Sequence, residues 1–131
     1  MTTLDIQTEQ RSQMLDVTST VSRVVRDSGV HEGLLHLFVP HTTAAITINE
    51  NADPDVIRDM LYGLEKLVPN DPAFRHAEGN SDAHIKSSLI GCQLSLPFSG
   101  GAPLLGTWQG IYFCEFDGPR QRQLQVKIIA G

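Results

Sequence analysis

The sequence lacks several features that would assign a protein class at once. It has no uninterrupted apolar run long enough to span a membrane, and no membrane partner is expected. The first ten residues, MTTLDIQTEQ, lack the basic and apolar regions of a secretory signal, which predicts a cytoplasmic protein. The only two cysteines, Cys92 and Cys114, have no C-x-x-C spacing. This favours two reduced, buried thiols over a disulfide or a redox pair.

Positive charge is also scarce. The 10 Lys and Arg residues are outnumbered by 15 Asp and Glu, giving a formal charge of −5 at pH 7. Nucleic acids and acidic membranes need a basic face, so neither is an expected partner. One local basic pocket for a phosphate remains compatible with this net charge.

Common catalytic signatures are missing as well: there is no phosphate-binding loop with its lysine, no H-E-x-x-H and no G-x-S-x-G.

The hydrophobic pattern predicts a single domain that spans residues 1–131. Expected strands and helices alternate along it, with one or two strands in residues 1–17, a helix over 18–28, strands over 34–39 and 44–50, helices from Pro54 and over 81–89, and strands over 92–96, 110–117 and 121–130. The expected N-cap is Asp53 for the helix from Pro54, and either Ser81 or Asp82 for the later helix. This order of elements predicts an α+β fold with two to three helices and a mixed or antiparallel sheet.

Polar residues continue the apolar face of four expected strands. Residues of equal parity share one face of a strand, so the apolar stripes end in His41, in Glu50, in Glu115 and Asp117, and in Arg120 and Arg122. Unpaired buried charge is costly, so such groups should pair or bind a ligand. A shared polar pocket is one interpretation, and strand ends that simply emerge into solvent are the other.

Three of the five histidines are candidates for a site. His41, His76 and His84 lie near the ends of expected elements, and three neutral imidazoles could bind Zn²⁺ and leave a fourth position for water. Their spacing matches no known ligand signature. On a helix, His84 shares a face with Ser87 and Ser88, so these three side chains should point in one direction.

Four segments taken in order resemble the signatures of the YjbQ-like family, and the resemblance covers nearly the whole chain. They are HTTAAITINE (41–50), RHAEGNSDAHIK (75–86), LGTWQGI (105–111) and EFDGPR (115–120). The resemblance implies a compact, β-sandwich-like α+β domain and a homotrimer with pockets near the subunit boundaries. The family carries the name secondary thiamine-phosphate synthase, for a reaction that joins a hydroxymethylpyrimidine diphosphate to a thiazole phosphate. Its pocket gathers residues that match His41, Glu50, His76, Asp82 and His84.

The first hypothesis is therefore a metal-assisted enzyme that acts on a phosphorylated small molecule, either as a transferase or as a hydrolase. Its catalytic residues would be His41, Glu50, Asp82 and His84, and its metal ligands His41, His76 and His84. Substrate would be held by Lys86, Trp108, Gln109, Arg120 and Arg122. Imidazole ligands favour Zn²⁺, whereas diphosphate sites usually hold Mg²⁺. The alternatives are a non-catalytic module that binds a metal or a phosphometabolite, and histidines that only cement a trimer interface.

Overall fold

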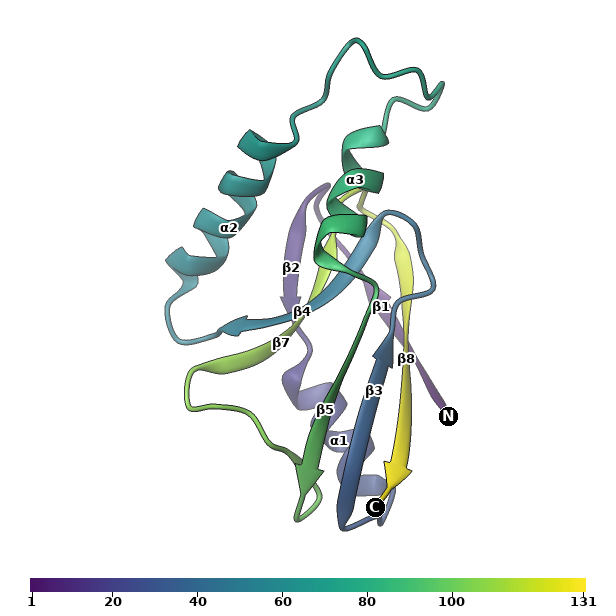
Figure 1. The fold of residues 1–131 in the computed structure, drawn as a ribbon, viewed down its shortest axis with the longest axis vertical. Helices are drawn as coiled ribbons and strands as arrows, with labels where there is room; N and C mark the ends of the chain where they lie inside the picture. The colour runs from purple at the N-terminus through teal and green to yellow at the C-terminus, as the bar shows by residue number, and fades with distance from the viewer.

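The computed structural model describes the whole chain, Met1 to Gly131. Its elements in order are β1 (Thr2–Gln7), β2 (Gln13–Asp16), α1 (Thr18–Asp27), β3 (Glu32–Phe38), β4 (Ala44–Glu50), α2 (Pro54–Leu67), α3 (Ser81–Ile90), β5 (Gln93–Ser99), β6 (Ala102–Pro103), β7 (Gln109–Glu115) and β8 (Gln121–Ala130) (Figure 1). The predicted elements are all present, and the two-residue strand β6 is the one that the pattern did not predict. No helix is both long and apolar enough to cross a membrane.

Two antiparallel sheets form the body of the molecule. One has five strands in the order β1-β8-β3-β5-β6, and the other has three in the order β2-β7-β4. Every strand pair is antiparallel, so the sheet is not mixed. The main core lies between the sheets and includes Leu35, Ile46, Phe113 and Leu124, one from each of four strands. The predicted α+β, sandwich-like fold is confirmed.

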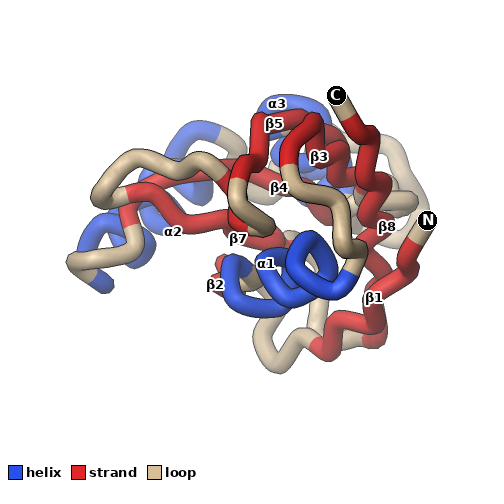
Figure 2. Tube along the Cα trace, turned by 90° about the horizontal axis from the view of Figure 1, so that it is seen from below, coloured by secondary structure: helices blue, strands red, loops and turns tan.

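Helix α1 completes this core from one side. Val21 and Val25, one helical turn apart, are completely buried and belong to the same cluster as the inner residues of both sheets. Figure 2 shows α1 lying across the side where the two sheets part. The spacing of valines in the sequence thus predicts both the helix and the face that it buries.

Helices α2 and α3 cover the outer face of the three-stranded sheet. Asp53 caps α2 as predicted, because its side chain accepts the backbone N–H of Asp55 at 2.9 Å. The N-cap of α3 is Asn80, so the expectation of Ser81 or Asp82 is wrong. Asp82 instead lies inside the first turn and is buried. Its carboxylate forms ion pairs with Arg11 and Lys86.

Candidate functional site

A polar pocket of about 480 Å³ lies between α3 and the loop that joins β3 to β4. It is lined by His41, Thr42, His84, Ser87, Ser88, Gly91 and Cys92. The predicted common face of His84, Ser87 and Ser88 is confirmed, since all three line this pocket. Cavities with a few convergent polar groups are the usual place for small-molecule chemistry. This pocket is therefore the candidate site.

The ring of His41 is held in one orientation by β8. Its Nε2 accepts the backbone N–H of Gln123 at 2.9 Å. A neutral imidazole that accepts at Nε2 carries its proton on Nδ1, so the ring offers one N–H donor. Burial lowers the pKa of His41 below its usual value, the positive charge of Arg122 lowers it further, and Glu115 opposes this in part. Burial and the charge of Arg122 thus keep the ring neutral at pH 7.

A buried ion pair stands beside this ring. Arg122 donates from Nε to Glu115 Oε1 at 2.8 Å and from Nη2 to Glu115 Oε2. Both side chains are almost completely removed from solvent. The equal parity of Arg122 and Glu115 with the apolar faces of β8 and β7 brings them together, so the predicted meeting of polar strand ends occurs here. Arg122 is thus paired inside the protein rather than presented to solvent.

A second network, centred on the buried Lys86 and Asp82, joins α3 to α2 and to the β1–β2 loop. Lys86 Nζ lies 2.5 Å from Glu65 Oε2 and 3.8 Å from Asp82 Oδ2, and Arg11 reaches Asp82 from the other side at 3.3 Å. Lys86 and Asp82 are both buried, and neither lines the pocket. The structure therefore gives these two predicted site residues partners of their own within the protein.

His76 and His84 lie next to each other. Their ring centroids are 5.5 Å apart and the rings are nearly perpendicular. His41 does not complete a three-histidine set with them, because the lone pair of its Nε2 already accepts Gln123 N–H and its Nδ1 carries the proton. No three side chains among His, Cys, Asp and Glu are arranged to hold a metal ion. The predicted set of three ligands does not fit this chain on its own.

Three other predicted residues lie at the opposite end of the three-stranded sheet, measured along its strands. Glu50 ends β4, about 20 Å along the strand from Ala44, which is beside the pocket. Gln109 pairs with Glu50 across the two strands, and Trp108 precedes it in an exposed turn. Arg120 lies nearer to the pocket and pairs with Asp117 on the surface at 3.1 Å. Within one chain, Glu50, Trp108 and Gln109 thus form a separate group.

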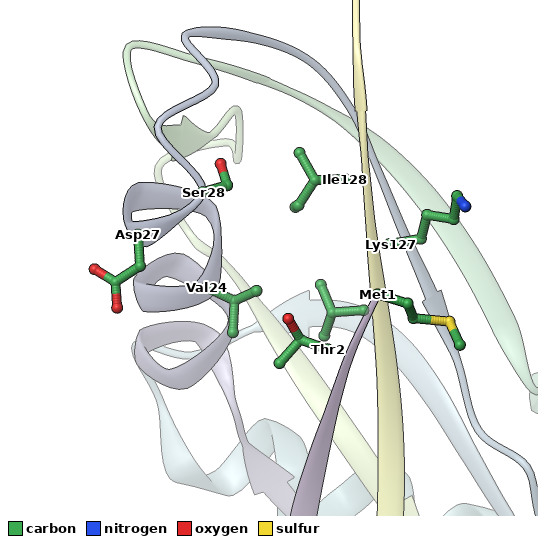
Figure 3. Close-up of a pocket in the computed structure, with 8 residues that line it drawn as sticks. Met1, Thr2, Val24, Asp27, Ser28, Lys127 and Ile128 are labelled. Carbon is green, nitrogen blue, oxygen red and sulfur yellow. The ribbon is translucent and has the colours of Figure 1, made fainter.

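A second cavity, of about 420 Å³, lies between α1 and the sheet formed by β1 and β8 (Figure 3). Its titratable groups are Asp27, Lys127 and the amino group of Met1, and Figure 3 shows the side chains of Asp27 and Lys127 pointing away from each other. Val24, Val126 and Ile128 make much of its wall apolar. It has no convergent pair of acid and base, so it is the weaker candidate for chemistry.

Some residues of the site were not predicted from sequence. The backbone N–H of Gln123 has no sequence signal, because any residue except proline supplies it. Cys92 lines the pocket and is half-buried, whereas the buried-thiol prediction is confirmed for Cys114, whose pKa burial raises to about 12. Both thiols are free. Strand parity predicts that Glu115 lies on the apolar face of its strand, but only the fold shows which arginine it pairs with.

The fold and site define an α+β two-sheet domain with a polar, histidine-containing pocket. A family profile described as "UPF0047 protein YjbQ-like" matches residues 2–131, and the chain belongs to this family. The UPF0047 protein MJ1081 of Methanocaldococcus jannaschii is 53% identical over 95% of this chain and 90% of its own length. YugU of Bacillus subtilis is 48% identical over 97% of each chain. A crystal structure of a YjbQ/UPF0047-family protein from Clostridium acetobutylicum superposes with a TM-score of 0.96, at 51% identity, over 98% of this chain and 100% of that one.

Proposed function

We propose that this protein is an enzyme that acts on a phosphorylated small molecule, and that the pocket beside His41 receives the phosphate group. The observation that carries the proposal is the hydrogen bond from Gln123 N–H to His41 Nε2. It leaves Nδ1–H as the donor of a ring that lines the pocket. A neutral imidazole donor beside positive charge is a suitable partner for a phosphate oxygen.

The electrostatic surroundings support an anion rather than a cation at this place. Arg122 and Arg120 both lower the pKa of His41, which means that positive potential from both reaches the ring. Glu115 neutralises part of the charge of Arg122, so Arg122 exerts less than the effect of a full positive charge on the pocket. Hydroxyl groups of Thr42 and Ser88 add neutral polar lining. This combination suits one phosphate group in an otherwise acidic protein.

His84 is the residue in the pocket that is placed to exchange protons with a bound substrate. It is half-buried and lines the pocket together with His41. The reaction class is group transfer or hydrolysis at the phosphorylated substrate, with secondary thiamine-phosphate synthesis as the family's named example. Glu50, Trp108 and Gln109 would join a pocket only from another copy, in a cytoplasmic homotrimer. The exposed Trp108, Leu67 and Leu89 supply apolar surface for such contacts.

Replacing His41 with glutamine should weaken sulfate binding about tenfold or more, because one hydrogen bond to a charged ligand is lost. Sulfate is the chosen probe since its charge does not change between pH 6 and pH 8. The loss should already be present at pH 8, where the lowered pKa of His41 leaves the native ring neutral. Isothermal titration calorimetry measures this.

The matched control for that experiment is His31→Gln, which changes an exposed histidine outside the pocket. It should leave sulfate affinity unchanged. Equal affinity in the native protein and in His41→Gln would show that the pocket does not bind the anion through this ring. A loss that appears only at pH 6 would mean that a cationic imidazole binds the anion, against a neutral ring whose Nε2 accepts from Gln123.

A divalent metal held by His76 and His84 is the second candidate, and the ring geometry favours it. Two imidazoles bound to one tetrahedral Zn²⁺ have centroids roughly 5 Å apart, given Zn–N distances of about 2.0–2.1 Å. The observed 5.5 Å is close to this. The two rings supply half of a tetrahedral set, so the remaining ligands would come from substrate, water or another copy. Mg²⁺ fits less well, because it prefers oxygen ligands.

Purified protein should then hold Zn²⁺ that His84→Ala loses, because one imidazole cannot retain the ion. Metal analysis after dialysis, together with the assembly size, measures this. His36→Ala is the control, since His36 lies on β3 and hydrogen-bonds Ser95 at 2.7 Å. Equal metal content in native protein and His84→Ala would remove the metal from the proposal. A changed assembly size in His84→Ala would instead favour a structural role of this histidine at an interface.

A further inference from the structure

The buried Glu115–Arg122 pair touches the loop that carries His41. Arg122 Nη2 donates to the hydroxyl of Thr43 at 2.8 Å and to the carbonyl of Thr43 at 3.2 Å. The same carbonyl also accepts the backbone N–H of Phe116 at 3.1 Å. Thr43 is itself buried and follows His41 by two residues. The loop is therefore fixed immediately beyond His41 by contacts from β8 and from the residue that follows β7.

The ring of His41 is fixed from the neighbouring residue of β8. Gln123, which directly follows Arg122, donates its backbone N–H to Nε2. Arg122 and Gln123 thus hold the loop and the ring from consecutive positions of one strand. We infer that the Glu115–Arg122 pair is a positioning element of this pocket: it fixes the β3–β4 loop and the β8 backbone so that His41 presents its Nδ1 proton to a bound anion. The inference rests on the proposed function of the pocket.

The chemistry of the pair suits positioning better than cohesion alone. Two apolar side chains of similar volume often hold a core as well as a buried ion pair does. A planar guanidinium, in contrast, can bind a carboxylate through one edge and reach further acceptors at fixed angles. Arg122 uses this property, because it contacts both oxygens of Glu115 and both oxygens of Thr43. Lysine carries its three donors on one freely rotating nitrogen, so it could not hold the two residues at the same fixed angles.

The charges around His41 give the pair a second effect. The charged groups that act on the ring are Arg122, Arg120 and Glu115, and His84 and Cys92 share its pocket. Arg122 lowers the pKa of His41 by more than Glu115 raises it. Removing both charges together should therefore raise the pKa of His41. That change follows from charge alone, whereas a change of the ring's tautomer would show that the pair also positions the ring.

The test compares the double variant Glu115→Gln/Arg122→Met with Thr43→Val and Thr43→Ser. ¹⁵N NMR of the histidine rings should show a single Nδ1–H tautomer for His41 in the native protein, and mixed tautomers with a higher pKa in the double variant. Sulfate affinity should fall about tenfold in the double variant. Thr43→Val, which loses only the hydroxyl contact, should weaken it severalfold, and Thr43→Ser, which keeps that contact, should restore it.

The readouts separate this inference from the function on which it rests. If the native protein binds no sulfate, the proposed function fails, and the tautomer comparison still decides the positioning role. If the double variant does not fold, the comparison of Thr43→Val with Thr43→Ser decides it, with the thermal transition as a control for folding. A folded double variant with native tautomer and native sulfate affinity overturns the inference. Equal ring behaviour in Thr43→Val and Thr43→Ser, with equal affinity, also overturns it.

Discussion

Replacing Arg122 with methionine should lower the free energy of unfolding by about 3–5 kcal/mol at pH 7, because it leaves the carboxylate of Glu115 buried without its partner. Glu115 is 0% exposed and Arg122 is 2% exposed, so water cannot take the place of the guanidinium. The remaining donors to Glu115 are the Thr8 hydroxyl at 2.8 Å and the Asp117 N–H at 2.9 Å. Urea denaturation of the two proteins measures the difference.

The pH dependence checks the sign of this effect. Burial alone would raise the pKa of Glu115, but the hydrogen bonds from Arg122, Asp117 and Thr8 outweigh it and the pKa lies below its usual value. In the native protein the ionised carboxylate thus adds stability above about pH 4.3, which is lost as the pH falls through the lowered pKa. In the variant the pKa should rise, so the gap between the two proteins should narrow from pH 7 to pH 4.5.

Arg120→Met is the matched control for Arg122→Met. Arg120 is half-exposed and pairs with Asp117 on the surface, so its loss should cost less than about 1 kcal/mol. The double variant Glu115→Gln/Arg122→Met should recover most of the stability that Arg122→Met loses, since no unpaired charge remains. Equal losses in Arg120→Met and Arg122→Met would show that the buried pair does not hold the fold together as described.

Replacing Lys86 with methionine should cost about 3 kcal/mol of stability, the lower end of the range for a broken buried ion pair. The loss leaves Asp82, which is 1% exposed, with Arg11 as its only remaining cationic partner at 3.3 Å. It also removes the contact between Lys86 and Glu65 that ties α3 to α2. Thermal unfolding followed by circular dichroism measures the effect.

The same variant separates the buried network from the pocket. Sulfate affinity of folded Lys86→Met should match that of the native protein, because Lys86 does not line the pocket. Asp82→Asn/Lys86→Met should regain stability, and Lys66→Met, on an exposed part of α2, should change little. A large loss of sulfate affinity with little loss of stability would return Lys86 to the substrate-binding role predicted from sequence.

The sequence predicts the elements of this fold well because their patterns are strong. The valine spacing of α1, the Asp53–Pro54 start of α2 and the alternation in β8 each depend on local chemistry that the structure reproduces. The misplaced cap of α3 has a tertiary cause. Aspartate is a residue type preferred at N-caps. Asp82 instead lies within the helix and is buried, where it forms ion pairs with Lys86 and Arg11.

The site was predicted in part, and the reason lies in what strand parity contains. Parity assigns a residue to a face of a sheet, and it correctly places His41, Glu115 and Arg122 on faces that meet. It does not say at which end of the sheet a strand terminates. Antiparallel pairing puts Ala44 opposite Glu115 and Glu50 opposite Gln109, so Glu50 lies at the far end of the strands. Which charges pair inside the protein, as Lys86 and Asp82 do, depends on contacts that no local pattern encodes.

The place of β8 in its sheet has a consequence for the order of folding. Gln121–Ala130 is the last of the strands in the chain, yet it lies between β1 and β3 and pairs with both. During synthesis, β1 must therefore wait for a partner that emerges more than a hundred residues later, and such distant pairings make folding slow. Because Arg122 and Gln123 belong to this strand, we expect the pocket beside His41 to form only after β8 has paired with its neighbours.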